Sequence, residues 1–77
     1  MDQNATQQTA QPVFLKIEEV RARTSMSTSA IYERMTAGVF PRPVGLGLGA
    51  GKRWIEQEID AWVIARIAER DAAANGK

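Results

Sequence analysis

The sequence predicts a small, mainly α-helical domain with one β-hairpin, in the order helix, helix, hairpin, helix. Three observations predict this fold: two short helical patterns separated by a serine-containing break, a proline- and glycine-rich segment between β-prone runs, and one long amphipathic pattern. With 77 residues the chain forms at most one small domain, whose core supplies only about 3–5 kcal/mol of stability. We expect this domain over residues 13–70, between a disordered N-terminal tail (1–12) and a flexible C-terminal tail (71–77).

The first half of the domain is expected to hold two short helices joined by a tight turn. Ile17, Val20 and Thr24 share one helical face, which predicts a helix over residues 16–23. Ser27 is placed to cap a second helix that ends at residue 35 or 36. Its buried face holds Ile31 and Met35. The opposite, exposed face then consists of Ser29, Tyr32, Glu33 and Thr36.

The second half is expected to hold an extended segment, a hairpin and a longer helix. The prolines after Phe40 exclude a helix there, because each lacks an N–H group. Residues 44–46 and 53–55 flank a glycine-rich loop, which predicts a hairpin whose tip needs positive φ angles. Residues 56–70 form the clearest helix, with carboxylates in its first turn. Its apolar side comprises Ile59, Trp62, Val63, Arg66 and Ile67, and both tryptophans, Trp54 and Trp62, are expected in the core.

The composition argues against an enzyme. The chain has no histidine and no cysteine, so it lacks the commonest metal ligands, the usual general base and any thiol; we expect neither metal nor cofactor. Residues 45–50 match G-x-G-x-x-A, but the βαβ unit that this dinucleotide motif needs does not fit here. No apolar stretch reaches the roughly 18–20 residues of a membrane span. The expectation is a soluble, cytoplasmic protein without a membrane partner.

Charge is distributed unevenly along the chain. Residues 13–55 carry seven basic and three acidic side chains, a net charge of +4, whereas residues 56–70 carry two basic and four acidic ones, a net charge of −2. Segregated charge in a small domain is typical of a protein that binds a polyanion, although a solvated surface also produces such a pattern. This feature favours nucleic acid as the partner.

A set of motifs resembles the AlpA family of phage and prophage regulators, with excisionase-like and MerR-type domains as wider relatives. The resemblance runs from Phe14 to Arg70: E-V in the first helix, S-x-S-x-I-Y from Ser27, F-P-x-P-V from Phe40, R-W at Arg53 and I-D-A-W from Ile59. It implies a winged helix-turn-helix that places the second helix in the major groove and the hairpin, as a wing, against the backbone or minor groove. The family usually has basic residues where Thr28 and Glu33 stand, so this chain carries less positive charge on that helix.

The resemblance also implies which residues contact DNA. On the second helix these are Ser27 as the cap, Thr28 at the edge, and Ser29, Tyr32, Glu33 and Thr36 on the base-reading face. A carboxylate such as that of Glu33 accepts a hydrogen bond from cytosine N4. The basic candidates for phosphate contacts are Lys52 and Arg53 on the wing, followed by Lys16, Arg21, Arg23, Arg34 and Arg42. Arg34 lies nearer the buried face, so its contact depends on how far the side chain reaches.

The implied function is a sequence-specific, double-stranded-DNA-binding transcriptional regulator of a phage or integrative element. One alternative is an excisionase, a recombination directionality factor that bends attachment-site DNA and recruits an integrase. Another is an adaptor that binds proteins through the acidic last helix. A single short recognition helix reads few base pairs, so we expect several copies on repeated sites, with Ile64 either contacting a neighbour or simply exposed. RNA polymerase is a further possible partner.

Overall fold

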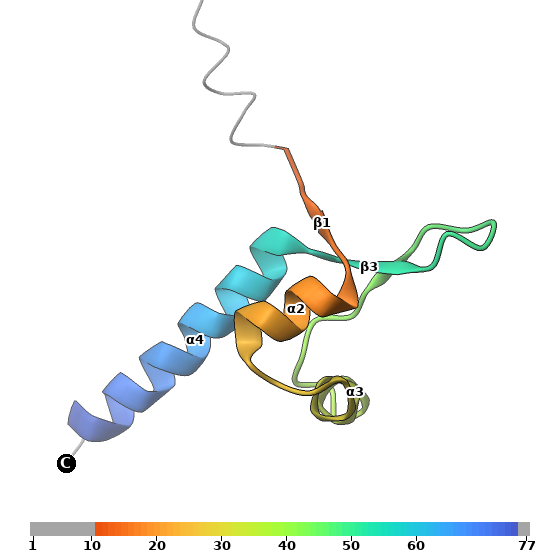
Figure 1. Cartoon of the computed structure of the whole chain (residues 1–77). Helices are drawn as coiled ribbons and strands as arrows, with labels where there is room; N and C mark the ends of the chain where they lie inside the picture. Colours follow the sequence, from red (N-terminus) through yellow and green to blue (C-terminus); the bar gives the residue numbers. More distant parts are fainter. Residues whose placement is uncertain (1–10, 76–77) are drawn as a thin grey trace, which may run out of the picture.

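The computed structural model describes residues 11–75 and has a three-stranded sheet with three helices around it (Figure 1). The elements are β1 (Phe14–Leu15), α2 (Ile17–Thr24), α3 (Thr28–Thr36), β2 (Val44–Gly45), β3 (Lys52–Ile55) and α4 (Glu56–Asn75). The predicted order of helix, helix, hairpin, helix is confirmed, and the architecture is that of a winged helix-turn-helix. The first ten residues of the predicted N-terminal tail lie outside the described part of the chain.

The sheet contains one strand that the sequence analysis omitted. Its order is β1-β3-β2 and both pairings are antiparallel, with Leu15 opposite Trp54 and Val44 opposite Arg53. The Glu56 N–H donates to the carbonyl of Val13 at 2.8 Å and extends the first pairing. β1 is only two residues long, so it shows no alternating pattern, and it becomes a strand by pairing with a distant segment.

Local signals set the boundaries of α2 and α3, the two helices of the helix-turn-helix. The Glu19 carboxylate accepts from the Lys16 N–H at 2.7 Å at the start of α2, and Ser25 ends that helix in the left-handed region with φ of 59°. The Ser27 hydroxyl accepts from the Ala30 N–H at 3.1 Å and caps α3. The predicted cap is therefore confirmed.

Removing this cap is expected to destabilise the domain. Ser27→Ala leaves the Ala30 N–H without its side-chain partner, and we expect a loss of about 1 kcal/mol. In a domain of this size that loss lowers the melting temperature by about 4–8 °C, measurable by circular dichroism. Ser29→Ala is the matched control, because the Ser29 side chain is exposed and forms no hydrogen bond within the described residues. Equal losses in both variants would contradict the capping role.

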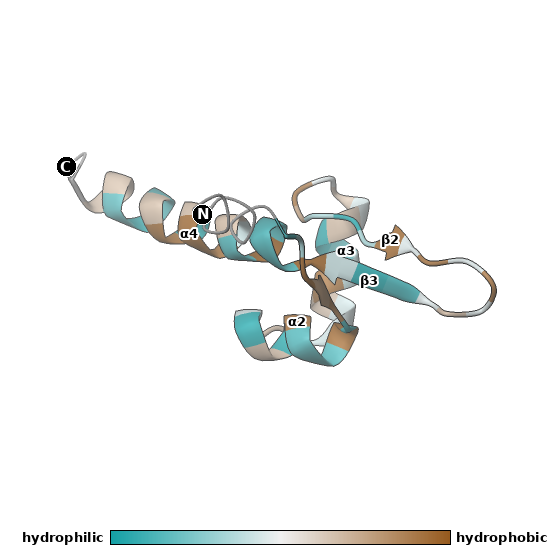
Figure 2. Ribbon diagram, turned by 90° about the horizontal axis from the view of Figure 1, so that it is seen from above, coloured by the Kyte–Doolittle hydropathy of each residue, from teal (hydrophilic) through white to brown (hydrophobic). Residues whose placement is uncertain are grey.

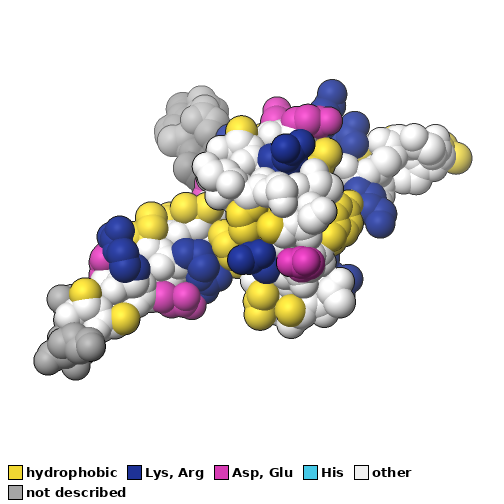
Figure 3. Space-filling model, turned by 60° about the horizontal axis from the view of Figure 1, so that its bottom comes forward, with side chains coloured by type: hydrophobic (Ala, Val, Ile, Leu, Met, Phe, Trp, Pro, Cys, Tyr) yellow, Lys and Arg dark blue, Asp and Glu magenta, His cyan; other side chains and the backbone are white. Residues whose placement is uncertain are grey.

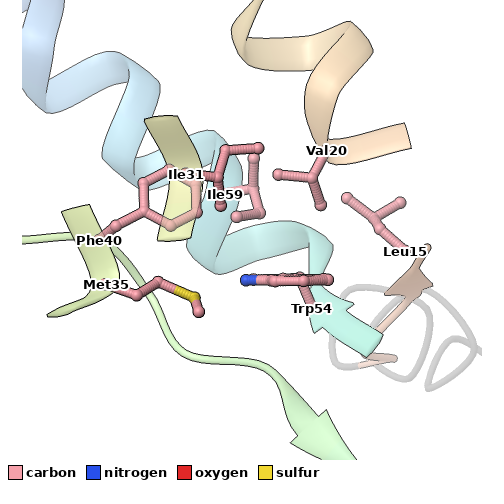
Figure 4. Packing of buried hydrophobic residues seen from close by; sticks show 7 residues of the cluster. All are labelled: Leu15, Val20, Ile31, Met35, Phe40, Trp54 and Ile59. Atoms are coloured by element: carbon pink, nitrogen blue, oxygen red, sulfur yellow. The ribbon is translucent and has the colours of Figure 1, made fainter. Parts of the chain in front are cut away.

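A single core receives side chains from five of the six elements and from the loop after α3 (Figure 4). Trp54 is 1% exposed, and its indole N–H donates to the Pro41 carbonyl at 3.1 Å. Trp62 is half-buried; its ring packs against Phe40 at 4.8 Å between centroids, and its N–H donates to the Val39 carbonyl at 2.7 Å. The buried cluster is Leu15, Val20, Ile31, Met35, Phe40, Trp54 and Ile59.

Helix α4 is longer than predicted and leaves the core along its length. It continues beyond Arg70 to Asn75, because the alanine-rich sequence favours helix even without packing. Ile59 is buried, but Ile67, which we expected on the buried side, is 47% exposed, and Ile64 is 64% exposed. The C-terminal half of α4 therefore projects away from the sheet, at the end of the molecule opposite the hairpin (Figures 1 and 2).

Candidate nucleic-acid interface

Helix α3 presents a polar face on the outside of the molecule. Ile31 is fully buried and Met35 is 7% exposed, so the helix is fixed by its inner face. The outer face is the predicted one, with four exposed side chains: Ser29, Tyr32, Glu33 and Thr36. The predicted orientation of α3 is confirmed, whereas the contacts of these residues with bases stay predictions. In Figure 1 this helix is seen end-on, apart from the other two helices.

The side chain of Tyr32 packs against Trp54 and is also partly exposed to solvent. Its ring meets the buried Trp54 edge-on, with 6.4 Å between centroids and an interplanar angle of 81°. Its side chain is nevertheless among the exposed large hydrophobic ones, at 40%. Packing of the ring is thus compatible with the predicted contact, because the packed ring holds the side chain in place and leaves part of it exposed.

Ser27, which caps α3, and Thr28, its first residue, have different roles. The hydroxyl of Ser27 is occupied by the cap, so Ser27 positions the helix. Thr28, the first residue of the helix, is exposed. Arg34 is also exposed, and its guanidinium donates to the Ala30 carbonyl of its own helix at 3.2 Å. Arg34 therefore lies along α3 instead of being enclosed by the core.

The hairpin of β2 and β3, which we call the wing, lies in a stretch of the chain whose charged residues are all basic. Between Glu33 and Glu56 the sequence has four basic residues and no acidic one. Lys52 is exposed, and Arg53 is partly buried with its guanidinium donating to the Lys52 carbonyl at 2.9 Å. Because successive side chains of a strand point to opposite faces, these two cations lie on opposite sides of the wing. Arg42, in the segment leading into β2, is exposed as well.

The tip of the wing has the backbone geometry that its glycines predict. The Leu46 N–H donates to the Gly51 carbonyl at 3.0 Å and the Ala50 N–H to the Gly47 carbonyl at 2.8 Å, which closes the loop. Positive φ angles occur at Gly47, Gly49 and Gly51, as expected for a tight glycine loop. The loop extends well beyond the rest of the molecule in Figure 2.

Arg23 has a structural partner that sequence reasoning missed. Its guanidinium donates to the Glu56 carboxylate at 2.6 Å and to the Asp60 carboxylate at 3.0 Å. The hydrogen bond to Glu56 raises the pKa of Arg23 above its ordinary value. This cation links α2 to the first turns of α4 and has two carboxylate partners there, while its predicted phosphate contact stays a prediction. Lys16 and Arg21, the other basic candidates on this side, are exposed.

Basic side chains are spread over the surface seen in Figure 3, around the helix-turn-helix and at the base of the wing. Within residues 11–75 we find no group of acidic side chains that could hold a metal ion. Nor does the described part of the chain contain a helix long and apolar enough to cross a membrane.

Comparison with known proteins finds a matching family model and a similar phage protein. The family model described as prophage CP4-57 regulatory protein (AlpA) matches residues 13–67, which include all five elements from β1 to β3 and the first twelve residues of α4. The uncharacterized protein ORF88 of Enterobacteria phage P4 is 42% identical over 57 residues, which are 74% of this chain and 64% of that protein. The match thus spans less than two thirds of the relative's length. No solved structure matches the chain.

Proposed function

Since the chain belongs to the AlpA family of prophage regulatory proteins, we propose that it regulates a phage or integrative element by binding specific sites on double-stranded DNA. In this proposal α3 enters the major groove, and the wing lies against the backbone or in the minor groove. The observation that carries it is the exposed polar face of α3, held in place by a buried inner face and accompanied by a wing without acidic residues.

The dimensions and chemistry of α3 suit the major groove. A helix is about 10–12 Å across with its side chains, and the major groove of B-DNA is about 12 Å wide. The outer face of α3 offers hydroxyls, a carboxylate and the Thr36 methyl group, which are able to contact base edges and the thymine methyl. In this arrangement Tyr32 lies at the middle of the reading face, and Glu33 discriminates through cytosine N4.

Basic side chains would supply the phosphate contacts. We assign these contacts to six basic residues: Lys52 and Arg53 on the wing, Arg42 in the segment before β2, Lys16 and Arg21 at α2, and Arg34 on α3. Such contacts position a protein on the duplex and make its affinity depend on salt, but carry no sequence information. A single domain with a nine-residue recognition helix reads few base pairs, so we propose cooperative binding of several copies to repeated sites.

The proposed binding of α3 and the wing to DNA would serve either the control of transcription or excision. Control of transcription requires sites that overlap a promoter, whereas an excision factor requires sites beside an attachment sequence and bends the DNA there. A footprint on the recovered sites distinguishes the two functions. A regulator of transcription would also contact RNA polymerase, whereas an excision factor would contact an integrase.

The first test is selection of genomic fragments by the purified full chain, followed by gel shifts of wild type and Tyr32→Ala. We expect discrete sites, and for Tyr32→Ala a loss of about tenfold in the ratio of specific to non-specific affinity, equivalent to about 1.4 kcal/mol. Tyr32→Phe is the matched control, because it keeps the ring against Trp54 and removes only the hydroxyl.

The outcomes separate the proposal from its rivals. If Tyr32→Phe binds as tightly and selectively as wild type while Tyr32→Ala does not, the ring rather than the hydroxyl provides the contact. If no fragment is enriched over bulk DNA even at 50 mM salt, the DNA-binding proposal is wrong. The acidic α4 would then become the surface on which to search for protein partners.

A further inference from the structure

The tip of the wing carries a leucine with no partner in the described protein. Leu48 is fully exposed, at 106% of its reference area, and its backbone lies in the left-handed region with φ of 49°. It stands between Gly47 and Gly49, whose φ angles are 75° and 77°. Hydrophobic atoms accordingly mark the end of the projecting loop in Figure 3.

Nothing in the free protein accounts for a leucine at this position. A left-handed backbone is costly for every residue with a Cβ atom except where local hydrogen bonding relieves it, and glycine would adopt it freely. The side chain also buries no apolar surface that would offset this cost. The residue is therefore unfavourable in isolation both for the backbone and for the side chain, which points to a bound state in which the side chain is covered.

The surroundings of Leu48 identify the kind of partner. The loop is slim, because Gly45, Gly47 and Gly49 carry no side chain, and no other atom lies within 4 Å of where their Cβ atoms would stand. It is carried on a hairpin whose charged side chains are all basic. A slim arm fits the minor groove, which is about 6 Å wide, and its cations suit the phosphates on either side. Beyond the deoxyribose C–H groups of the groove walls, the large apolar surface that a leucine could cover there is the faces of the bases, which become accessible when a base step opens.

We propose that Leu48 is a wedge that enters the minor groove, inserts between two adjacent base pairs and kinks the duplex. The inference rests on the proposed DNA binding and adds a residue and a deformation to it. Apolar side chains inserted in this way partly unstack a base step and bend DNA by about 20–90° towards the major groove. Steps that unstack easily, such as TA and CA/TG, are then preferred beneath the wing without any hydrogen bond to their edges.

The test compares wild type with Leu48→Gly and Leu48→Ala on a duplex recovered by the genomic selection. Energy transfer between dyes at the two ends of the duplex reports the bend, and 2-aminopurine placed at successive steps reports unstacking. We expect the bend to fall by at least half in both variants and the 2-aminopurine signal at one step to disappear, with affinity reduced by about tenfold or less. Leu48→Gly is also expected to raise the melting temperature of the free protein.

Leu46→Ala provides the matched control. It also truncates a leucine of the wing, but Leu46 is only 39% exposed, compared with 106% for Leu48. It should leave the bend and the 2-aminopurine signal unchanged. If Leu48→Gly binds the duplex with the wild-type bend and signal, the wedge is wrong while DNA binding stands. If the wild-type chain binds no duplex, the proposed function fails and the wedge fails with it.

Discussion

Trp54→Ala is expected to unfold most of the protein at 25 °C. The side chain is 1% exposed and lies in the central strand, where β3 pairs with both β1 and β2. Its ring supports Tyr32 on α3, and its N–H satisfies the Pro41 carbonyl. Truncating a buried aromatic side chain to alanine costs about 3–5 kcal/mol. That loss equals the whole stability expected of a domain this small, about 3–5 kcal/mol.

Urea denaturation followed by circular dichroism measures this loss. Trp54→Phe is the matched variant, because it keeps an aromatic ring in the core and removes the hydrogen bond to Pro41. We expect it to remain folded, with a loss of about 1–3 kcal/mol from the unpaired carbonyl and the smaller ring. A Trp54→Ala variant that melts within 5 °C of wild type would show that the core does not depend on this residue.

The double variant Lys52→Ala/Arg53→Ala is expected to bind every DNA sequence more weakly. Each phosphate contact contributes about 0.9 to the slope of log affinity against log salt, so two lost contacts reduce the slope by about 1.8. The affinity at 0.1 M salt then falls by about 60-fold, and the loss shrinks as the salt concentration rises. Because phosphate contacts carry no sequence information, the ratio of specific to non-specific affinity stays close to that of wild type.

Arg66→Ala/Arg70→Ala removes the same charge from α4 and serves as the control. These arginines pair with Glu69 and Asp71 on the part of the molecule opposite the wing. Titrations at several salt concentrations should give the wild-type slope for this variant. Equal slopes for the two double variants would mean that general charge, and not the wing, drives binding.

Local signals made most of the fold predictable. The cap at Ser27, the prolines after Phe40 and the glycine loop each act on neighbouring backbone, so both short helices, the hairpin and the outer face of α3 follow from them. The buried faces were predictable for the same reason, since helical spacing alone places Ile31 and Met35 together.

The remaining features depend on which elements meet in space. β1 exists because β3 lies beside it, and the Arg23 link exists because α2 and α4 are neighbours. Neither contact leaves a pattern in the adjoining sequence. The end of α4 was missed because apolar spacing reports packing, whereas alanine-rich sequence remains helical without it.

The central position of β3 determines when α3 takes its folded position in a nascent chain. Helix α3 has only nine residues, too few to persist on its own in water, and the side chains that hold its inner face include Trp54 and Ile59. On the ribosome, the outer face of α3 is synthesised before the segments that support it. The helix therefore takes its folded position only after β3 and the first turns of α4 have emerged, so a chain interrupted before that point would lack the surface that we propose for DNA binding.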